Sequence, residues 1–304
     1  MRLTLLIATL FMACSGRLDL PPQQQDEIHQ PFSATWVRVG GGCFTDIAFW
    51  GSTMIGLGCA DVDSLHDKVI KVRLANGTWT EHPGAATSLS SDGFALVAVS
   101  GSGAIWRWDV PSQNWQHLPG TQGVGRTPNP GVIAIYGNVT YVISTDAQVY
   151  QFVGVSSPPD GSQSYWAPLQ PQLSSFVGRI STNSTHGVTA VTSACSAASN
   201  LLRHSPLPAN AWTTVGQFGG LGCFRDATVQ LPGSINFEQV WAVKGSDGIP
   251  RQLNNSDGNW LSKPLPASAA PFNTAARLVG DNANNRVLAL GPPSDPQGNL
   301  WINQ

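Results

Sequence analysis

The chain has 304 residues, a net charge of −2 and only 11% charged residues, so it lacks the basic character that nucleic-acid binding requires. Its 32 glycines, 22 prolines and 11 tryptophans leave no window with a sustained helical period. This composition excludes a helical bundle and predicts an all-β protein of short strands and turns.

Residues 1–16 have the features of an export signal. Arg2 precedes an apolar segment, residues 3–12, which is too short to span a bilayer, and small residues follow it. FMAC at 11–14 resembles a bacterial lipoprotein box, which would place a lipid on Cys14; ordinary cleavage after Gly16 is the alternative. We expect a secreted or surface-anchored, extracytoplasmic protein, with membrane attachment only through that lipid.

Residues 17–33 are rich in Pro and Gln and have no periodicity, which is typical of an extended tether. Nothing after residue 34 resembles a linker. Residues 34–304 are therefore predicted to form a single domain of about 270 residues, a size that all-β domains reach.

The segment 101–120, GSGAIWRWDVPSQNWQHLPG, contains the pattern that recurs along the chain. A Gly-Ser-Gly turn leads into an alternating strand, a cluster of turn formers follows, and Trp115 begins a short strand that Pro119 and Gly120 end. Five other tryptophans occupy the same place as Trp115, at intervals of 36 to 51 residues: Trp36, Trp79, Trp166, Trp212 and Trp260.

Three strand-like runs lie between successive repeat tryptophans, although the run near Ser88 is weak. The other runs are 46–50, 54–59, 68–74, 94–99, 105–108, 132–136, 139–144, 148–153, 177–181, 188–193, 201–204, 227–231, 239–243 and 251–253. A last set, at 275–279, 286–290 and 299–302, has no tryptophan strand after it. Four short strands per repeat indicate propeller blades. Residues 35–39 would then supply the missing strand, giving a six-bladed β-propeller closed by an N-terminal outer strand.

Four cysteines remain when Cys14 is set aside, and an even number fits an oxidising compartment. Cys43 and Cys59 flank a hairpin with its turn at residues 51–52, so a bridge between them is plausible and would contribute ~3 kcal/mol. By exclusion, Cys195 would pair with Cys223.

The segment 103–120 resembles a tectonin repeat, as in tachylectin-like propellers, and has weaker similarity to a kelch repeat. One repeat fits this pattern well and the repeats around Trp79 and Trp166 fit in part. The resemblance implies a six-bladed propeller without catalytic residues, and a lectin function in the tectonin group.

The tryptophans outside the repeat position are the candidate carbohydrate-binding residues. Trp106 and Trp108 share one strand face and could stack on a sugar ring, although packing between blades explains them as well. The other candidates lie near predicted strand ends and are Trp50, Trp241 and Trp301. The six repeat tryptophans are predicted to be structural.

No constellation in the sequence predicts an enzyme, a cofactor or a metal centre. The histidines are scattered and share no motif with a nucleophile or carboxylate. Asp61, Asp63, His66 and Asp67 form the densest run of candidate calcium ligands, but this run lacks the glycine and glutamate of a calcium loop. The SDGNW sequence at 256–260 is shorter than a sialidase box.

Two functions from different classes follow from these observations. The first is an exported, non-catalytic lectin that binds a glycan or glycoconjugate. The alternative is a protein-binding or structural scaffold at the cell surface, with a surface protein as partner.

Overall fold

The computed structural model describes residues 35–40, 42–119, 132–136, 139–156, 164–174, 177–183, 187–192, 200–205, 211–217, 224–230, 239–254, 259–266, 274–281, 286–294 and 298–303. They all belong to one compact unit, Thr35–Gln304. The export signal and tether predicted at 1–33 lie outside the described residues. Among the described residues, no helix is both long and apolar enough to cross a membrane.

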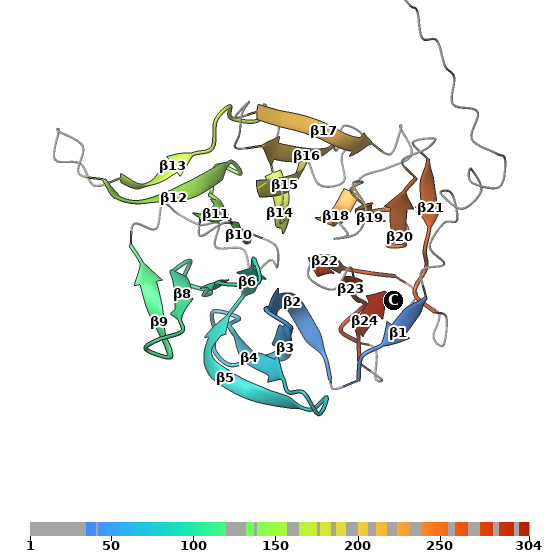
Figure 1. Cartoon of the computed structure of the whole chain (residues 1–304), viewed down its shortest axis with the longest axis horizontal. Coiled ribbons are helices and arrows are strands. Elements are labelled where there is room, and N and C mark those ends of the chain that lie inside the picture. The colour runs from blue at the N-terminus through green and yellow to red at the C-terminus, as the bar shows by residue number, and fades with distance from the viewer. Residues whose placement is uncertain are drawn as a thin grey trace, which may run out of the picture. The chain divides into compact units, whose positions relative to one another are not determined.

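The described strands form six four-stranded antiparallel sheets, the blades of a β-propeller (Figure 1). Blade 1 contains β2 (Phe44–Trp50), β3 (Thr53–Asp61), β4 (Lys68–Arg73) and β5 (Trp79–Ala86). Blade 2 contains β6 (Ser88–Ser91), β7 (Leu96–Val99), β8 (Ile105–Asp109) and β9 (Asn114–Leu118). Blade 3 contains β10 (Ile133–Tyr136), β11 (Val139–Ile143), β12 (Val149–Ser156) and β13 (Ser164–Pro168).

The second half of the ring repeats this order. Blade 4 contains β14 (Val177–Asn183), β15 (Gly187–Thr192), β16 (Asn200–Ser205) and β17 (Ala211–Gln217). Blade 5 contains β18 (Phe224–Gln230), β19 (Gln239–Lys244), β20 (Pro250–Leu253) and β21 (Trp260–Ser262). Blade 6 combines β22 (Arg277–Asp281), β23 (Arg286–Leu290) and β24 (Leu300–Asn303) with β1 (Trp36–Arg38).

The N-terminal strand closes the ring, as the strand count predicts. β1 pairs antiparallel with β24, with Trp36 opposite Asn303 and Arg38 opposite Trp301. Blade 6 therefore takes its outermost strand from the start of the described chain (Figure 1). This pairing removes the open edge that the last blade would otherwise expose.

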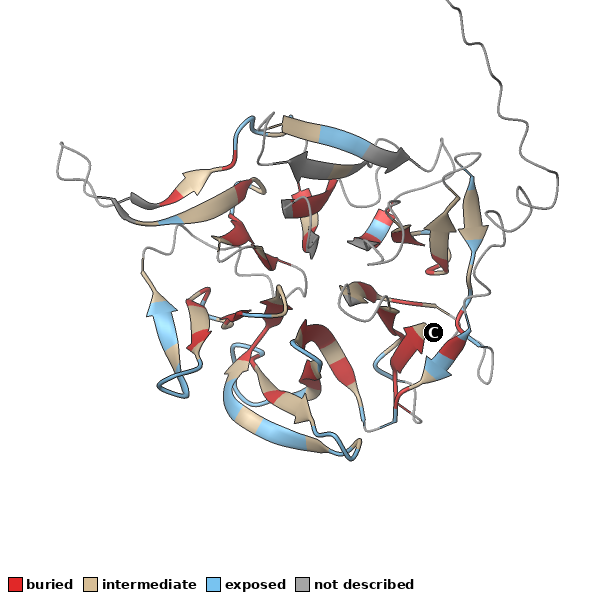
Figure 2. Ribbon diagram, in the orientation of Figure 1, coloured by how far each residue is buried: buried red, intermediate tan, exposed pale blue. Residues whose placement is uncertain are grey.

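Burial decreases from the centre of the ring to its rim (Figure 2). All four residues of β7 are buried, whereas the outer strand β5 alternates exposed and half-buried residues along most of its length. Inner strands are covered by neighbouring blades on both faces, which is why β7 is a continuous apolar run. The weak run near Ser88 is the innermost strand of blade 2, and the strand predicted from residue 94 begins at Leu96.

Candidate functional site

The repeat tryptophans lie in the outermost strands and link each blade to its neighbour. Five of them donate an indole Nε1 hydrogen bond to a backbone carbonyl three to five residues after the previous repeat tryptophan. The pairs are Trp36 to Lys263 (3.1 Å), Trp79 to Gly40 (3.1 Å), Trp115 to Pro83 (2.6 Å), Trp166 to Pro119 (3.1 Å) and Trp212 to Pro171 (3.0 Å). In four of the five pairs the acceptor is a Pro or Gly that follows the previous tryptophan, and Lys263 is the exception. These bonds confirm a structural role for the five tryptophans.

The five tryptophans predicted to bind carbohydrate do not share one surface. Trp108, Trp241 and Trp301 are buried, with 8%, 1% and 3% of their surface exposed. Trp241 packs edge-on against Trp36, and the Arg38 guanidinium lies 4.1 Å from the Trp301 ring centroid. These three ring faces meet protein, so a sugar could not stack on them in this conformation.

The remaining two predicted tryptophans, Trp50 and Trp106, are half-buried. Trp106 makes an edge contact with the His117 ring on the adjacent strand, with 5.0 Å between the ring centroids. Trp50 lies at the end of β2, where it meets the next blade. Carbohydrate binding through these residues stays a prediction.

Two hydrogen bonds join the hairpin tips of blades 1 and 2. Trp50 donates its Nε1 hydrogen to the Phe94 carbonyl (3.1 Å), and the Gly51 amide donates to the Gly93 carbonyl (2.7 Å). The Phe94 side chain is 87% exposed, the most exposed of the large apolar side chains among the described residues. Its loop is held by Asp92, whose carboxylate accepts the backbone amide of Phe94.

Two other exposed apolar residues lie in turns on the same face of the ring as these hairpin tips. Leu74 lies in the β4–β5 turn and Val110 in the β8–β9 turn, with 45% and 52% exposure. Because antiparallel strands alternate in direction, the first and third turns of a blade lie on one face of the ring. That face carries Phe94 and Trp50 as well, and we call these four residues the hairpin-tip patch.

A buried ion network connects the innermost strands of three blades. Arg277 on β22 donates from Nε to Asp46 on β2 (3.0 Å) and from Nη1 to Asp226 on β18 (3.2 Å). Asp46 also accepts the Leu89 amide and the Ser88 hydroxyl of blade 2, and Asp226 accepts the Leu278 amide. Each carboxylate thus has partners on the next blade, which satisfies the requirement that buried charges be paired.

Burial alone would lower the pKa of Arg277, but the carboxylates of Asp226 and Asp46 outweigh it and raise the pKa above its usual value. The guanidinium is therefore held in its charged form. Sequence analysis did not identify this network as a site. The sequence does contain one indication of the network. The segment GCFTD at 42–46 recurs as GCFRD at 222–226, so Asp46 and Asp226 occupy matching positions in their blades.

A shared backbone irregularity positions these charges. The register shifts between Phe44 and Asp46 in blade 1, between Phe224 and Asp226 in blade 5, and between Val177 and Arg179 in blade 4. A bulge of this kind redirects the side chain that follows it. Blade 4 therefore presents Arg179 where blades 1 and 5 present aspartates.

The acidic run at 61–67 forms the β3–β4 loop and does not gather into one site. Asp61 pairs with Lys68 and His66, while Asp63 accepts the Leu65 amide. Asp67 accepts the Gly101 amide of blade 2 (2.7 Å). Among the described residues, no group of three or more His, Cys, Asp or Glu side chains is arranged to hold a metal ion.

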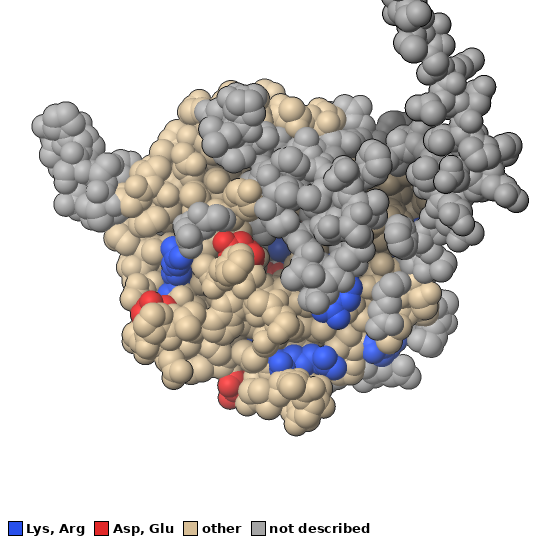
Figure 3. All heavy atoms as spheres, viewed as in Figure 1, with Lys and Arg blue, Asp and Glu red and all other residues tan. Residues whose placement is uncertain are grey.

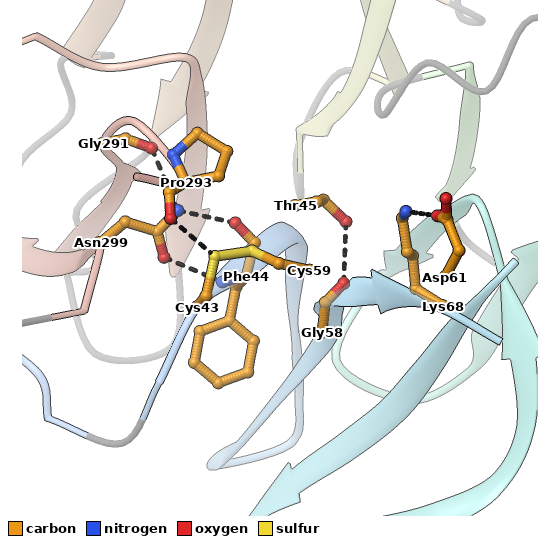
Figure 4. Close-up of a disulfide and its surroundings, with 10 residues drawn as sticks. All are labelled: Cys43, Phe44, Thr45, Gly58, Cys59, Asp61, Lys68, Gly291, Pro293 and Asn299. Carbon is orange, nitrogen blue, oxygen red and sulfur yellow. Dashed lines mark hydrogen bonds and ion pairs between the residues drawn. A yellow bond between two sulfur atoms is a disulfide. The ribbon is translucent and has the colours of Figure 1, made fainter. Parts of the chain in front are cut away.

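The hairpin at the start of blade 1 contains the Cys43–Cys59 disulfide that the sequence favours (Figure 4). Beside it, the Asn299 side chain binds both the amide and the carbonyl of Phe44, at 2.9 and 2.7 Å, and joins blade 6 to blade 1. Cys195 and Cys223 lie outside the described residues.

The face seen along the ring axis carries scattered charges of both signs and no large area of one sign among its described residues (Figure 3). This pattern agrees with the low charge content of the sequence. It gives no electrostatic surface for a polyanion on the described part of that face.

No protein-family model and no curated protein sequence matches the chain. The solved structure of YCF48 bound to D1 peptide is 14% identical with a TM-score of 0.52, and the match covers 86% of this chain and 76% of that chain. YCF48 from Cyanidioschyzon merolae is 14% identical with a TM-score of 0.53, covering 89% and 98%.

A third similar structure is a structural genomics protein of unknown function from Bacteroides thetaiotaomicron, which is 11% identical with a TM-score of 0.55 over 89% of this chain and 75% of that chain. At these identities the likeness establishes the β-propeller fold alone. The tectonin-repeat type stays a prediction.

Proposed function

We propose that this protein is a non-catalytic propeller scaffold that binds a protein partner through the hairpin-tip patch. The observation that carries the proposal is Phe94, which is 87% exposed in a turn whose backbone carbonyl is held by the Trp50 indole of the neighbouring blade. Aromatic residues are enriched in the cores of protein interfaces, where such anchors dominate the binding energy. A similarly folded propeller was solved with a bound peptide, which adds support.

We also propose that the protein works outside the cytoplasm. The Cys43–Cys59 disulfide supports this location, because disulfides persist in oxidising compartments. The predicted export signal supports it independently.

A peptide selection tests the binding surface. Peptides selected from a displayed random library against the whole protein should be rich in apolar residues, and Phe94→Ser should weaken their binding at least about tenfold, as expected for an interface anchor. Val62→Ser is the matched control, because Val62 is 49% exposed on the β3–β4 loop at the opposite end of the strands.

Equal binding by the wild type and Phe94→Ser would reject this surface. A glycan array provides the competing test: specific glycan binding that Trp50→Ala or Trp106→Ala abolishes, without any peptide selected, would favour the lectin function and overturn the scaffold proposal.

A further inference from the structure

Arg179 lies on β14, the innermost strand of blade 4 (Figure 1), and the charges of the ion network described above act on it. Its Nη1 atom is buried and has no hydrogen-bond partner in the part of the chain that the structure describes. The side chain of Arg277, in contrast, is bonded to two carboxylates. An arginine carries five donors and cannot lose its charge at physiological pH, so a buried donor without an acceptor is costly.

The local charges do not balance around Arg179. The charged groups whose fields reach it are Asp226, Arg277, Asp46 and Arg225. Counted over the described residues and including Arg179 itself, they comprise three guanidinium groups and two carboxylates, an excess of one positive charge. Both carboxylates already accept bonds from Arg277 and from backbone amides of neighbouring blades.

Burial lowers the pKa of Arg179, and the nearby Arg277 and Arg225 act in the same direction. The bulge between Val177 and Arg179 nevertheless gives this side chain the position that aspartates occupy in blades 1 and 5. As a whole the residue is only half-buried, so part of it remains in contact with water.

From this geometry we propose that Arg179 anchors a binding site for a single carboxylate group on the ring-centre side of blade 4. A carboxylate offers two oxygens that match the guanidinium fork, and its charge compensates the surplus positive charge. The carboxylate belongs either to a small carboxylic acid or to the C-terminus of a peptide. This site lies apart from the hairpin-tip patch and does not depend on the proposed scaffold function.

Thermal unfolding of the whole protein tests the proposal with four probes. These are sodium acetate, sodium chloride at equal ionic strength, N-acetyl-trialanine with a free C-terminus and the same peptide amidated. At least one of the two carboxylate probes should raise Tm, by about 5 °C at about one hundred times its Kd and further with the logarithm of its concentration. Chloride and the amidated peptide should not. If acetate raises Tm, a small carboxylic acid is sufficient as the ligand. If only the peptide with a free C-terminus raises Tm, the ligand is the C-terminus of a peptide.

The variants separate ligand binding from a structural role. Arg179→Met should abolish the carboxylate response and raise the Tm of the ligand-free protein, because it removes an unpaired buried cation. Arg179→Lys should keep the charge but weaken binding about tenfold, because the fork is lost. Arg107→Met on β8 of blade 2, which lies outside the group of charges around Arg179, should keep the full response.

Two results would overturn the proposal. One is a wild-type Tm that neither carboxylate raises above its value in sodium chloride of equal ionic strength. The other is an equal response in the wild type and Arg179→Met, which would place the bound anion elsewhere.

Discussion

Trp36 donates its indole hydrogen to the backbone carbonyl of Lys263 over 3.1 Å, across 227 residues of sequence. The first described strand and the outer strand of blade 5 are thereby joined at the rim. The same type of bond, from a repeat tryptophan to the preceding blade, recurs within the ring. The closing strand is therefore held to the preceding blade in the same way as the other outer strands.

Two N-terminal deletions test this closure. A chain that begins at Phe32 keeps β1 and should unfold at the temperature of the longer chain. A chain that begins at Gly40 lacks the buried Trp36, and the loss of such a side chain costs about 3–5 kcal/mol. We expect Tm to fall by on the order of 10 °C, with aggregation through the exposed edge of β24. Equal stability of the two chains, measured by calorimetry, would refute closure by β1.

Replacing Trp115 with Phe tests the contribution of one bond between blades. The substitution removes the Nε1 donor to Pro83 and should cost about 1 kcal/mol, or roughly 2–4 °C in Tm. Trp106→Phe is the control, because Trp106 lies on the adjacent strand and its indole has no hydrogen-bond acceptor among the described residues. Thermal melts followed by circular dichroism measure the Tm of both variants. Equal decreases in Tm would argue against a contribution from the Trp115 hydrogen bond.

Arg277→Met should be among the most destabilising single substitutions in the chain. It leaves the buried carboxylates of Asp46 and Asp226 without their cation, a change that typically costs roughly 3–5 kcal/mol. Arg225→Met, at an exposed site, should change the unfolding free energy by less than about 0.5 kcal/mol. Urea titration measures both values. A stable Arg277→Met protein would mean that the network is dispensable.

His82 should make stability depend on pH. Burial lowers its pKa, although a bond to the Pro83 carbonyl opposes the shift, and its ring packs 4.3 Å from Trp108 between centroids. The unfolded chain therefore binds the proton more tightly than the folded chain. Stability should fall as pH decreases below about 6.5, the ordinary value for histidine.

His82→Gln should remove this part of the pH dependence, and His117→Gln on the exposed side of β9 should leave it intact. Unfolding free energies measured between about pH 5 and pH 8 give the comparison. The same pH slope in wild type and His82→Gln would assign the effect to another group.

The sequence by itself determined the blade pattern. Strand alternation and the spacing of the repeat tryptophans are local features, and counting them was enough to predict six blades and the closing role of residues 35–39. The disulfide between Cys43 and Cys59 could also be predicted from the sequence, because both cysteines lie in one hairpin. These features depend on residues near one another in the chain, where the geometry of strands and turns fixes the outcome.

Only the tertiary structure decided which side chains meet across blades. Trp241 and Trp301 are near strand ends in the sequence, yet neighbouring blades bury them, while Phe94, which was predicted to begin a strand, is exposed in a turn. Arg277 reaches Asp46 over 231 residues. No local sequence pattern predicts a contact between residues so far apart in the chain, because that contact depends on how the six blades pack around a common centre.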